Sequence, residues 1–227
     1  MSTCIVLPAR FGQGTNDTVM IDVLKIIKPP GAKEVLCRPI SQQETPEIFF
    51  VKEFPPQEIT VALRPLCLAT DIEPVFQWMN HEFAKSTWQP GHGPLRQLQQ
   101  TFELILCSDF AQSLVALVNG EPVCQLDIYR AAQHDISLLY DVKVGDYNIS
   151  ILFSPDYKKD VTRAACVLQA FKDYFFRCEG IKRIIADPDA DDFIVNDLLE
   201  NMGFQLKKKT YMSYKLANLY VCTKMGY

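Results

Sequence analysis

The sequence has no long apolar run, few histidines and no paired cysteine motif. None of its apolar stretches approaches the roughly 18 residues of a membrane-spanning helix, and its opening residues lack the basic leader and apolar length of a secretory signal. Its eight cysteines are scattered without a CxxC pair, which favours reduced core residues over disulfides. Only three histidines accompany them, so we expect no metal site. These absences predict a cytoplasmic protein that neither enters a membrane nor holds a metal.

A strong charge of either sign is also missing. The 227 residues carry 23 basic and 27 acidic side chains, a net charge of −4, which gives no reason to expect nucleic acid as a partner. Hydrophobic residues make up 48% and charged residues 22%, values typical of a globular chain with one substantial core. Nucleic acid is therefore not expected as a partner, and the oligomeric state is left open.

Residues 1–56 differ from the rest of the chain. They hold short apolar runs separated by turn signals, of which Pro29-Pro30-Gly31 is the strongest. We interpret them as an extension of short strands packed on a main domain at residues 57–227. The extension is suited to covering a sheet edge, completing a binding site or contacting a partner, and its residues do not select among these.

From Ile59 onward the pattern is regular and predicts an α/β or α+β domain with a mixed sheet. A strand is followed by two helices, the first capped by Thr70 or Asp71, and then by an antiparallel meander that turns at Asn119-Gly120. A βαβαβ segment completes the chain. The predicted strands are 59–66, 112–118, 121–131, 135–144, 147–153, 181–188, 204–216 and 219–222, and the predicted helices are 71–84, 95–107, 161–176 and 191–202.

Four stretches within this domain resemble motifs of one protein family. Residues 76–88 resemble a Trp-Met-Asn motif that closes on a tryptophan, and residues 119–130 resemble a hairpin with an acid two positions before a tyrosine. Residues 144–160 resemble an Asp-x-Gly-x-His strand with the coenzyme A loop after it, and residues 186–204 an acid-Pro-Asp stretch before a helix. In this order they resemble the siderophore-biosynthesis branch, which acylates hydroxylysine or a related amine, of the Gcn5-related N-acetyltransferase (GNAT) superfamily.

The resemblance implies a GNAT-like fold, a mixed and splayed sheet flanked by helices. It also implies transfer of an acyl group, most simply from acetyl-CoA, to a small-molecule amine or hydroxylamine. The coenzyme would bind at the turn between strand 147–153 and helix 161–176, where backbone N–H groups and the helix dipole attract phosphate. The implied cofactor-binding residues are Phe153, Ser154, Tyr157, Lys158, Lys159, Asp160 and Arg163.

This turn departs from the family pattern because it contains no glycine. Asp160 stands where the family tends to have one, and glycine normally allows phosphate to approach the backbone closely. Lys158, Lys159 and Arg163 could offset the acidic charge. The alternative is a solvated connection of mixed charge.

The catalytic position departs from the pattern as well. The family is proposed to use a histidine on the central strand as general base, and the match places Ser150 there. A serine hydroxyl does not accept a proton as imidazole does, so that mechanism does not transfer directly. Asp189 and His134 are the other catalytic candidates. Asp189 could equally be a turn or cap residue, and His134 a histidine of the preceding strand.

The acceptor pocket is expected to involve Asn80, Trp88, Asp127 and Tyr129. Aromatic faces and carboxylates together suit an amine or hydroxylamine. Trp88 could instead belong to the packing of the first helix. Two further functions remain open: a degenerate member of the family that binds without turnover, and an acyltransferase for a different amine.

Overall fold

The computed structural model describes residues 46–85, 94–158, 160–212 and 215–224. The predicted N-terminal extension lies outside them up to residue 45, so the proposed domain boundary stays a prediction. The part of the extension that is described contains strand β1 (Phe50–Phe54), which pairs antiparallel with β2 (Ile59–Pro65) at one sheet edge. Among the described residues, no helix is long and apolar enough to span a bilayer.

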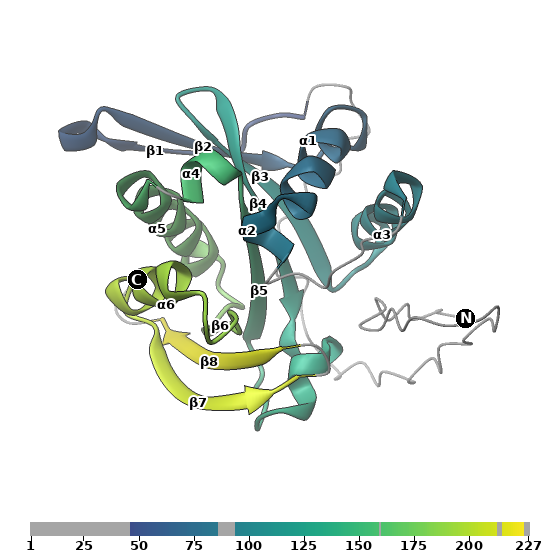
Figure 1. The fold of residues 1–227 in the computed structure, drawn as a ribbon. Coiled ribbons are helices and arrows are strands. Elements are labelled where there is room, and N and C mark those ends of the chain that lie inside the picture. Colours follow the sequence, from purple (N-terminus) through teal and green to yellow (C-terminus); the bar gives the residue numbers. More distant parts are fainter. Residues whose placement is uncertain (1–45, 86–93, 159, 213–214, 225–227) are drawn as a thin grey trace.

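The described strands form one eight-stranded sheet in the order β1-β2-β3-β4-β5-β6-β8-β7 (Figure 1). The remaining strands are β3 (Ala111–Val118), β4 (Glu121–Arg130), β5 (Asp146–Phe153), β6 (Arg183–Ala186), β7 (Gln205–Tyr211) and β8 (Leu216–Thr223). The central pair β5–β6 is parallel, and every other neighbouring pair in this sheet is antiparallel. The sheet is therefore mixed, as predicted.

Helices cover both faces of the sheet (Figure 1). One face carries α1 (Leu68–Asn80), α2 (Glu82–Lys85) and α3 (Leu95–Cys107), and the other carries α4 (Pro155–Lys158), α5 (Val161–Arg177) and α6 (Phe193–Asn201). Short 3-10 turns are η1 (Pro55–Gln57), η2 (Ala131–Gln133) and η3 (Asp135–Leu138). This arrangement confirms the splayed, helix-flanked fold class implied by the resemblance.

The alternation of strand side chains divides the core into two layers. On β4, Leu126 and Ile128 join the layer under α5, which includes Phe171. The next residues along the same strand point the opposite way, and Tyr129 packs with Phe102 of α3. Polar residues of β4 and β5 that share the second face are therefore buried beneath α1 and α3.

The predicted strand at residues 135–144 is wrong. The chain forms η3 there, just after η2, and a loop follows. Ile136 is buried, but Leu138 and Val144 are largely exposed, so the apparent alternation does not mark a buried face. Tyr140 O–H and Lys143 N–H both donate to the Asp146 carboxylate, which holds the loop compact without a strand partner.

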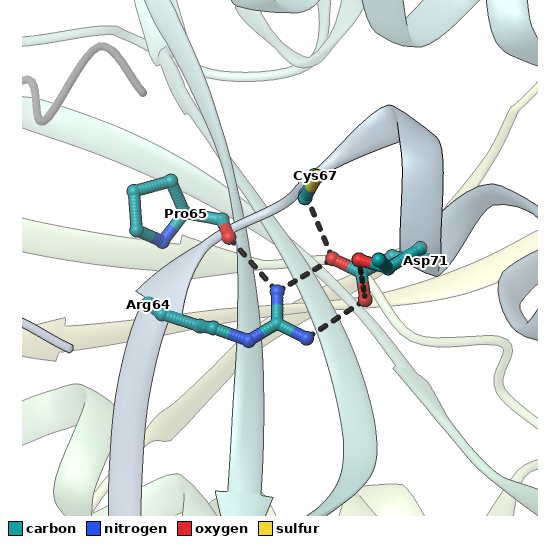
Figure 2. A network of polar contacts seen from close by, with 5 residues as sticks. Arg64, Pro65, Cys67 and Asp71 are labelled. Atoms are coloured by element: carbon teal, nitrogen blue, oxygen red, sulfur yellow. Dashed lines mark hydrogen bonds and ion pairs between the residues drawn. The ribbon is translucent and has the colours of Figure 1, made fainter. Parts of the chain in front are cut away.

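The predicted cap of the first helix is also wrong. Helix α1 begins at Leu68, and its N-cap position, Cys67, makes no side-chain capping bond. The Asp71 carboxylate instead accepts the Cys67 N–H at 2.7 Å and two N–H groups of Arg64 at 2.6 and 2.7 Å (Figure 2). Asp71 therefore ties the start of α1 to the end of β2 through a buried ion pair.

Several local signals are confirmed. Asn119 and Gly120 have positive φ values of 51° and 93°, as a two-residue hairpin turn with both central residues left-handed requires. Helix α6 begins after Asp192, whose carboxylate accepts the Val195 N–H at 3.3 Å, and Gly203 follows its end with a φ of 85°.

Candidate functional site

A cleft opens where β5 and β6 separate. The two strands pair from Asp146 and Arg183 as far as Ile149 and Ala186, whereas β5 continues to pair with β4 up to Phe153. A cavity of about 530 Å³, including its open mouth, occupies the gap. Its lining comes from β5, the end of β6, α6 and the start of β8: Ile149, Ser150, Ile151, Ala186, Asp187, Pro188, Asp192, Val195, Leu199 and Lys215.

An ion pair holds the opposite end of these strands together. Arg183 of β6 donates from Nε to the Asp146 carboxylate at 2.6 Å and forms a second bond to it through Nη2. Gly145 precedes Asp146 with a φ of 91°, and a Cβ there would lie 2.6 Å from the Lys182 side chain. One end of the parallel pair is thus fixed, and the strands diverge from it.

Asp187 is one of three charged residues that line the cleft, with Asp192 and Lys215. Its Oδ1 accepts a hydrogen bond from Asn148 Nδ2 at 2.8 Å, and its Oδ2 lies 3.3 Å from Lys215 Nζ. The side chains of Asp187 and Lys215 are only 7% and 8% exposed, so a paired carboxylate is held beside the cavity. Sequence reasoning did not select Asp187, although it is the acid of the acid-Pro-Asp stretch.

Asp189 lies in the turn after β6 and does not line the cavity. Its carboxylate accepts the Asp191 N–H at 2.9 Å, and its carbonyl oxygen accepts from Asn196 Nδ2 at 2.8 Å. These contacts fit a residue that stabilises the turn before α6. The predicted catalytic role of Asp189 has no support from its position.

Ser150 lines the cavity and lies directly opposite Asp127 in the β4–β5 register. Asp127 is 4% exposed and accepts hydrogen bonds from Ser113 Oγ and from Gln125 Nε2, the second at 2.6 Å. Burial raises the pKa of Asp127 to about 6, and hydrogen bonds from Ser113, Tyr129 and Gln125 oppose that rise. The carboxyl group is therefore mostly ionised at pH 7 even though it is buried.

His134 does not lie on a strand, which corrects its predicted position. It lies between η2 and η3, and its ring centroid is 4.9 Å from that of Tyr129. Burial lowers the pKa of His134, while Asp187 and Asp135 act in the opposite direction. Its Nδ1 accepts the Ile136 N–H at 3.3 Å, so the neutral ring carries its proton on Nε2. In this tautomer His134 donates at Nε2.

The predicted cofactor turn contains a helical turn, α4, before α5 begins. Asp160 caps α5 by accepting the Arg163 N–H at 3.0 Å and also forms an ion pair with the Arg163 guanidinium at 3.2 Å. That guanidinium lies 5.4 Å from the centroid of the Tyr157 ring. Phe153 and Ser154 are buried at the end of β5. Lys159 and the side chain of Lys158 lie outside the described residues.

The structure brings together only part of the predicted acceptor pocket. Asp127 and Tyr129 share the sheet face under α1 and α3, since Tyr129 belongs to the core layer of those helices. Asn80 is exposed at the end of α1, where its Nδ2 donates to the Phe76 carbonyl oxygen at 2.8 Å. Trp88 lies outside the described residues. No group of three possible metal ligands occurs within the described part of the chain.

A family described as the acetyltransferase (GNAT) domain matches residues 67–212. The chain is also similar to the N-hydroxyputrescine acetyltransferase of Acinetobacter baumannii, at 24% identity over 170 residues that make up 75% of this chain and 81% of the relative.

Solved structures share the fold. A Bacillus halodurans protein of uncharacterised function superimposes with a TM-score of 0.71 at 21% identity, covering 77% of this chain and 89% of that one. The aminoglycoside acetyltransferase AAC(6')-Ib, solved with acetyl-CoA, superimposes with a TM-score of 0.65 at 19% identity, covering 72% and 93% of the two chains.

Proposed function

The chain belongs to the acetyltransferase (GNAT) domain family and is an acyltransferase, and we propose that it transfers an acyl group from acetyl-CoA to the nitrogen of a hydroxylamine. The observation that carries this proposal is the cavity between β5 and β6 with a paired carboxylate at its wall.

The residues around the cleft fit an acyl-CoA co-substrate, which supplies an activated thioester when bound. Ile149, Ile151 and Val195 give the cavity an apolar wall suited to an extended pantetheine arm. The first N–H groups of α5 have no partner within the helix and can bind the pyrophosphate. Asp160 already accepts one N–H group of this turn, so the phosphate has to compete with it.

The backbone of β5 is placed to polarise the thioester carbonyl. Beyond Ile149 this strand has lost β6 as a partner, so its backbone groups on that side face the cavity. N–H groups fixed in a strand stabilise the negative charge that develops on the carbonyl oxygen without having to reorganise.

Asp187 is the group we assign to receive the proton. The nitrogen lone pair of the acceptor forms a bond to the carbonyl carbon, and the carbon–sulfur bond breaks. The N–H proton passes to Asp187 and then to the departing sulfur, so that coenzyme A leaves as the thiol. A hydroxylamine is weakly basic and neutral near pH 7, which reduces the demand for a strong base.

The other predicted catalytic residues take different roles in this proposal. Ser150 orients the acceptor through its hydroxyl group, which lines the cavity. His134 interacts with the Asp187 charge, and we assign it no step in the proton transfer. Asp189 shapes the turn.

The name of the Acinetobacter relative supports a hydroxylamine acceptor and, through it, a part in siderophore biosynthesis. The cytoplasmic location expected from the sequence belongs to the same proposal. The surviving alternatives are a member of the family that binds coenzyme A without turnover and one that acylates another amine.

The test pairs two variants of neighbouring aspartates. Asp187→Asn is expected to lower kcat with acetyl-CoA and an N-alkylhydroxylamine by roughly 10²-fold, the lower range for loss of a general base, with little change in acetyl-CoA affinity. Asp189→Asn is the matched control and is expected to keep kcat within about twofold. Measuring the Tm of both variants shows whether a fall in kcat comes from the loss of the proton acceptor or from unfolding of the protein.

Two outcomes would contradict the proposal. Wild-type protein that binds acetyl-CoA but acylates no hydroxylamine or amine would support the non-catalytic alternative. A loss of kcat in Asp189→Asn that matches the loss in Asp187→Asn would remove the assignment of the proton acceptor.

A further inference from the structure

Lys215 brings a buried ammonium group to the cleft from the hairpin that joins β7 to β8. It immediately precedes β8, and its carbonyl oxygen accepts the Met212 N–H at 2.9 Å, which pairs the two ends of the hairpin. Its side chain is 8% exposed and lines the cavity. Burying an ammonium group costs free energy even when the group is paired, so stability alone does not explain this position.

Lys215 contacts Asp187 at two places. Its Nζ lies 3.3 Å from Asp187 Oδ2 and also donates to the Asp187 carbonyl oxygen. Asn148 Nδ2 of β5 donates to the other carboxylate oxygen, Oδ1, at 2.8 Å and to the Ile185 carbonyl oxygen at 3.3 Å. Each oxygen of an ionised carboxylate can accept about two hydrogen bonds, so these contacts orient the group and leave it able to take a proton.

Backbone bonds fix the hairpin that carries Lys215 to the stretch that carries Asp187. The Asn218 N–H donates to the carbonyl oxygen of Pro188, which directly follows Asp187, at 3.0 Å. A second bond of 2.8 Å joins the Ala190 N–H to the first residue of β8. The two charged residues are therefore placed by the backbone, and little freedom is lost when their side chains pair.

The other titratable residues near Asp187 bring no positive charge at neutral pH. They include Asp189 and Asp192, which follow it before α6, and His134 and Asp135, which lie between and within η2 and η3. Burial lowers the pKa of His134, while Asp187 and Asp135 oppose this effect and Lys215 adds to it, so the ring is mostly neutral at pH 7. Among the described residues that line the cavity, Lys215 is the only cation.

On the basis of the proposed function, we propose that Lys215 is a positioning residue that keeps Asp187 ionised at the cavity wall and thereby sets the lower end of the pH range of acyl transfer. An opposite charge within about 4–6 Å favours the ionised form of a carboxyl group by about 1–3 pH units. Without Lys215, the buried Asp187 carboxylate takes up a proton at a higher pH and then cannot receive one from the acceptor. Lys215 acts through Asp187 and not on the reacting atoms.

The experiment measures kcat against pH with acetyl-CoA and an N-alkylhydroxylamine. In Lys215→Met we expect the acid limb to move up by about 1–3 pH units, which lowers kcat at pH 7 by about tenfold or more and lets it recover at higher pH. The KM for acetyl-CoA should stay within about twofold. Protonation of the acceptor itself contributes equally to both proteins. Lys215→Arg keeps the charge and should restore most of the wild-type profile.

A double-variant cycle separates the positioning role from a packing role. In an Asp187→Asn background no carboxylate has to be kept ionised, so adding Lys215→Met should change kcat by no more than about twofold. Lys209→Met, an exposed change on β7 of the same hairpin, is the matched control and should leave the pH profile in place. If Lys215→Met does not fold, Lys215→Gln removes the charge and keeps a polar side chain.

The two proposals fail in different ways. Wild-type turnover with the same acid limb in Lys215→Met, or a loss of kcat of equal size at every pH, would overturn the role of Lys215 and leave acyl transfer intact. If the wild type acylates no acceptor, the proposed function fails. NMR of protein with carboxyl-labelled aspartate, assigned with Asp187→Asn, then tests the pair by itself. An Asp187 titration midpoint about 1–3 pH units higher in Lys215→Met supports it, and coincident midpoints refute it.

Discussion

Asp146 and Asp127 are buried to almost the same extent, at 3% and 4% exposure, on neighbouring strands of one sheet. Asp146 is paired with the Arg183 guanidinium and also accepts from Tyr140 and the Lys143 backbone. Asp127 receives only neutral donors. The first carboxylate closes one end of the β5–β6 pair, and the second retains an unbalanced charge. The difference indicates that a buried carboxylate with a cationic partner stabilises the fold, whereas a buried carboxylate with neutral donors alone keeps a charge that a ligand could balance.

The largest expected effect comes from breaking the complete network. Arg183→Met leaves the Asp146 carboxylate buried without its cation, which should lower the free energy of unfolding by about 3–5 kcal/mol. The corresponding fall in Tm is roughly 6–20 °C for a chain of this size, measured by thermal unfolding. Lys207→Met on the exposed strand β7 is the control and should shift Tm by at most about 2 °C. A similarly small shift in Arg183→Met would show that the pair does not hold the strands.

Removing the charge of the incomplete network around Asp127 should raise the free energy of unfolding, and the size of this gain should depend on pH. Burial raises the pKa of Asp127 from its ordinary value of 3.8 to about 6. Between these values the unfolded chain has released a proton that the folded chain retains, so folding loses stability as the pH rises from about 4 to about 6. The full difference, at most about 3 kcal/mol, is reached above pH 6.

Asp127→Asn removes this ionisation, so we expect it to stabilise the protein at pH 8 relative to the wild type and to give little or no gain at pH 4. Urea unfolding at the two pH values measures the difference. A gain of equal size at both pH values would point to packing as the cause. A loss of stability at pH 8 would mean that the ionised carboxylate is better balanced than its contacts indicate.

The smallest effect concerns the cofactor turn, where Asp160 pairs with Arg163. Asp160→Asn keeps a side chain that can cap α5 and releases the guanidinium, so the Kd for acetyl-CoA should fall by about two- to fivefold, as expected for an exposed ion pair. Calorimetric titration measures the change. The same substitution in an Arg163→Ala background is the control, and an equal gain there would show that the pairing is irrelevant to binding.

Sequence reasoning predicted most of the fold because local signals agreed with the tertiary structure. The Asn119-Gly120 turn, the helix at α3 and the element order each have a local physical cause. The strand prediction for Asp135 to Val144 was wrong because the residue alternation there is typical of a strand. The structure of this segment depends instead on polar contacts with Asp146. The predicted cap of α1 was wrong because Asp71 accepts hydrogen bonds from Arg64, which precedes it by seven residues.

The candidate site was only partly predictable for a related reason. Asp127, Tyr129 and Ser150 were identified from the family motifs that they match, and alternation along the strands then fixes which face each occupies. Asp187 was missed in favour of Asp189. The two acids are separated only by Pro188, and no sequence pattern states which of them faces the cleft. Their difference arises from the turn, where Asp191 and Asn196 engage Asp189.

The short pairing between β5 and β6 has a dynamic consequence. Only four residue pairs join the part of the sheet before this seam to β6, β8 and β7 after it. Elements joined by few backbone bonds can open as a cooperative unit below the free energy of global unfolding. We therefore expect amide hydrogens of β6 to exchange faster than those of β3 and β4, with bound coenzyme slowing exchange across the seam. The site that performs the chemistry would then also be the place where the domain first comes apart.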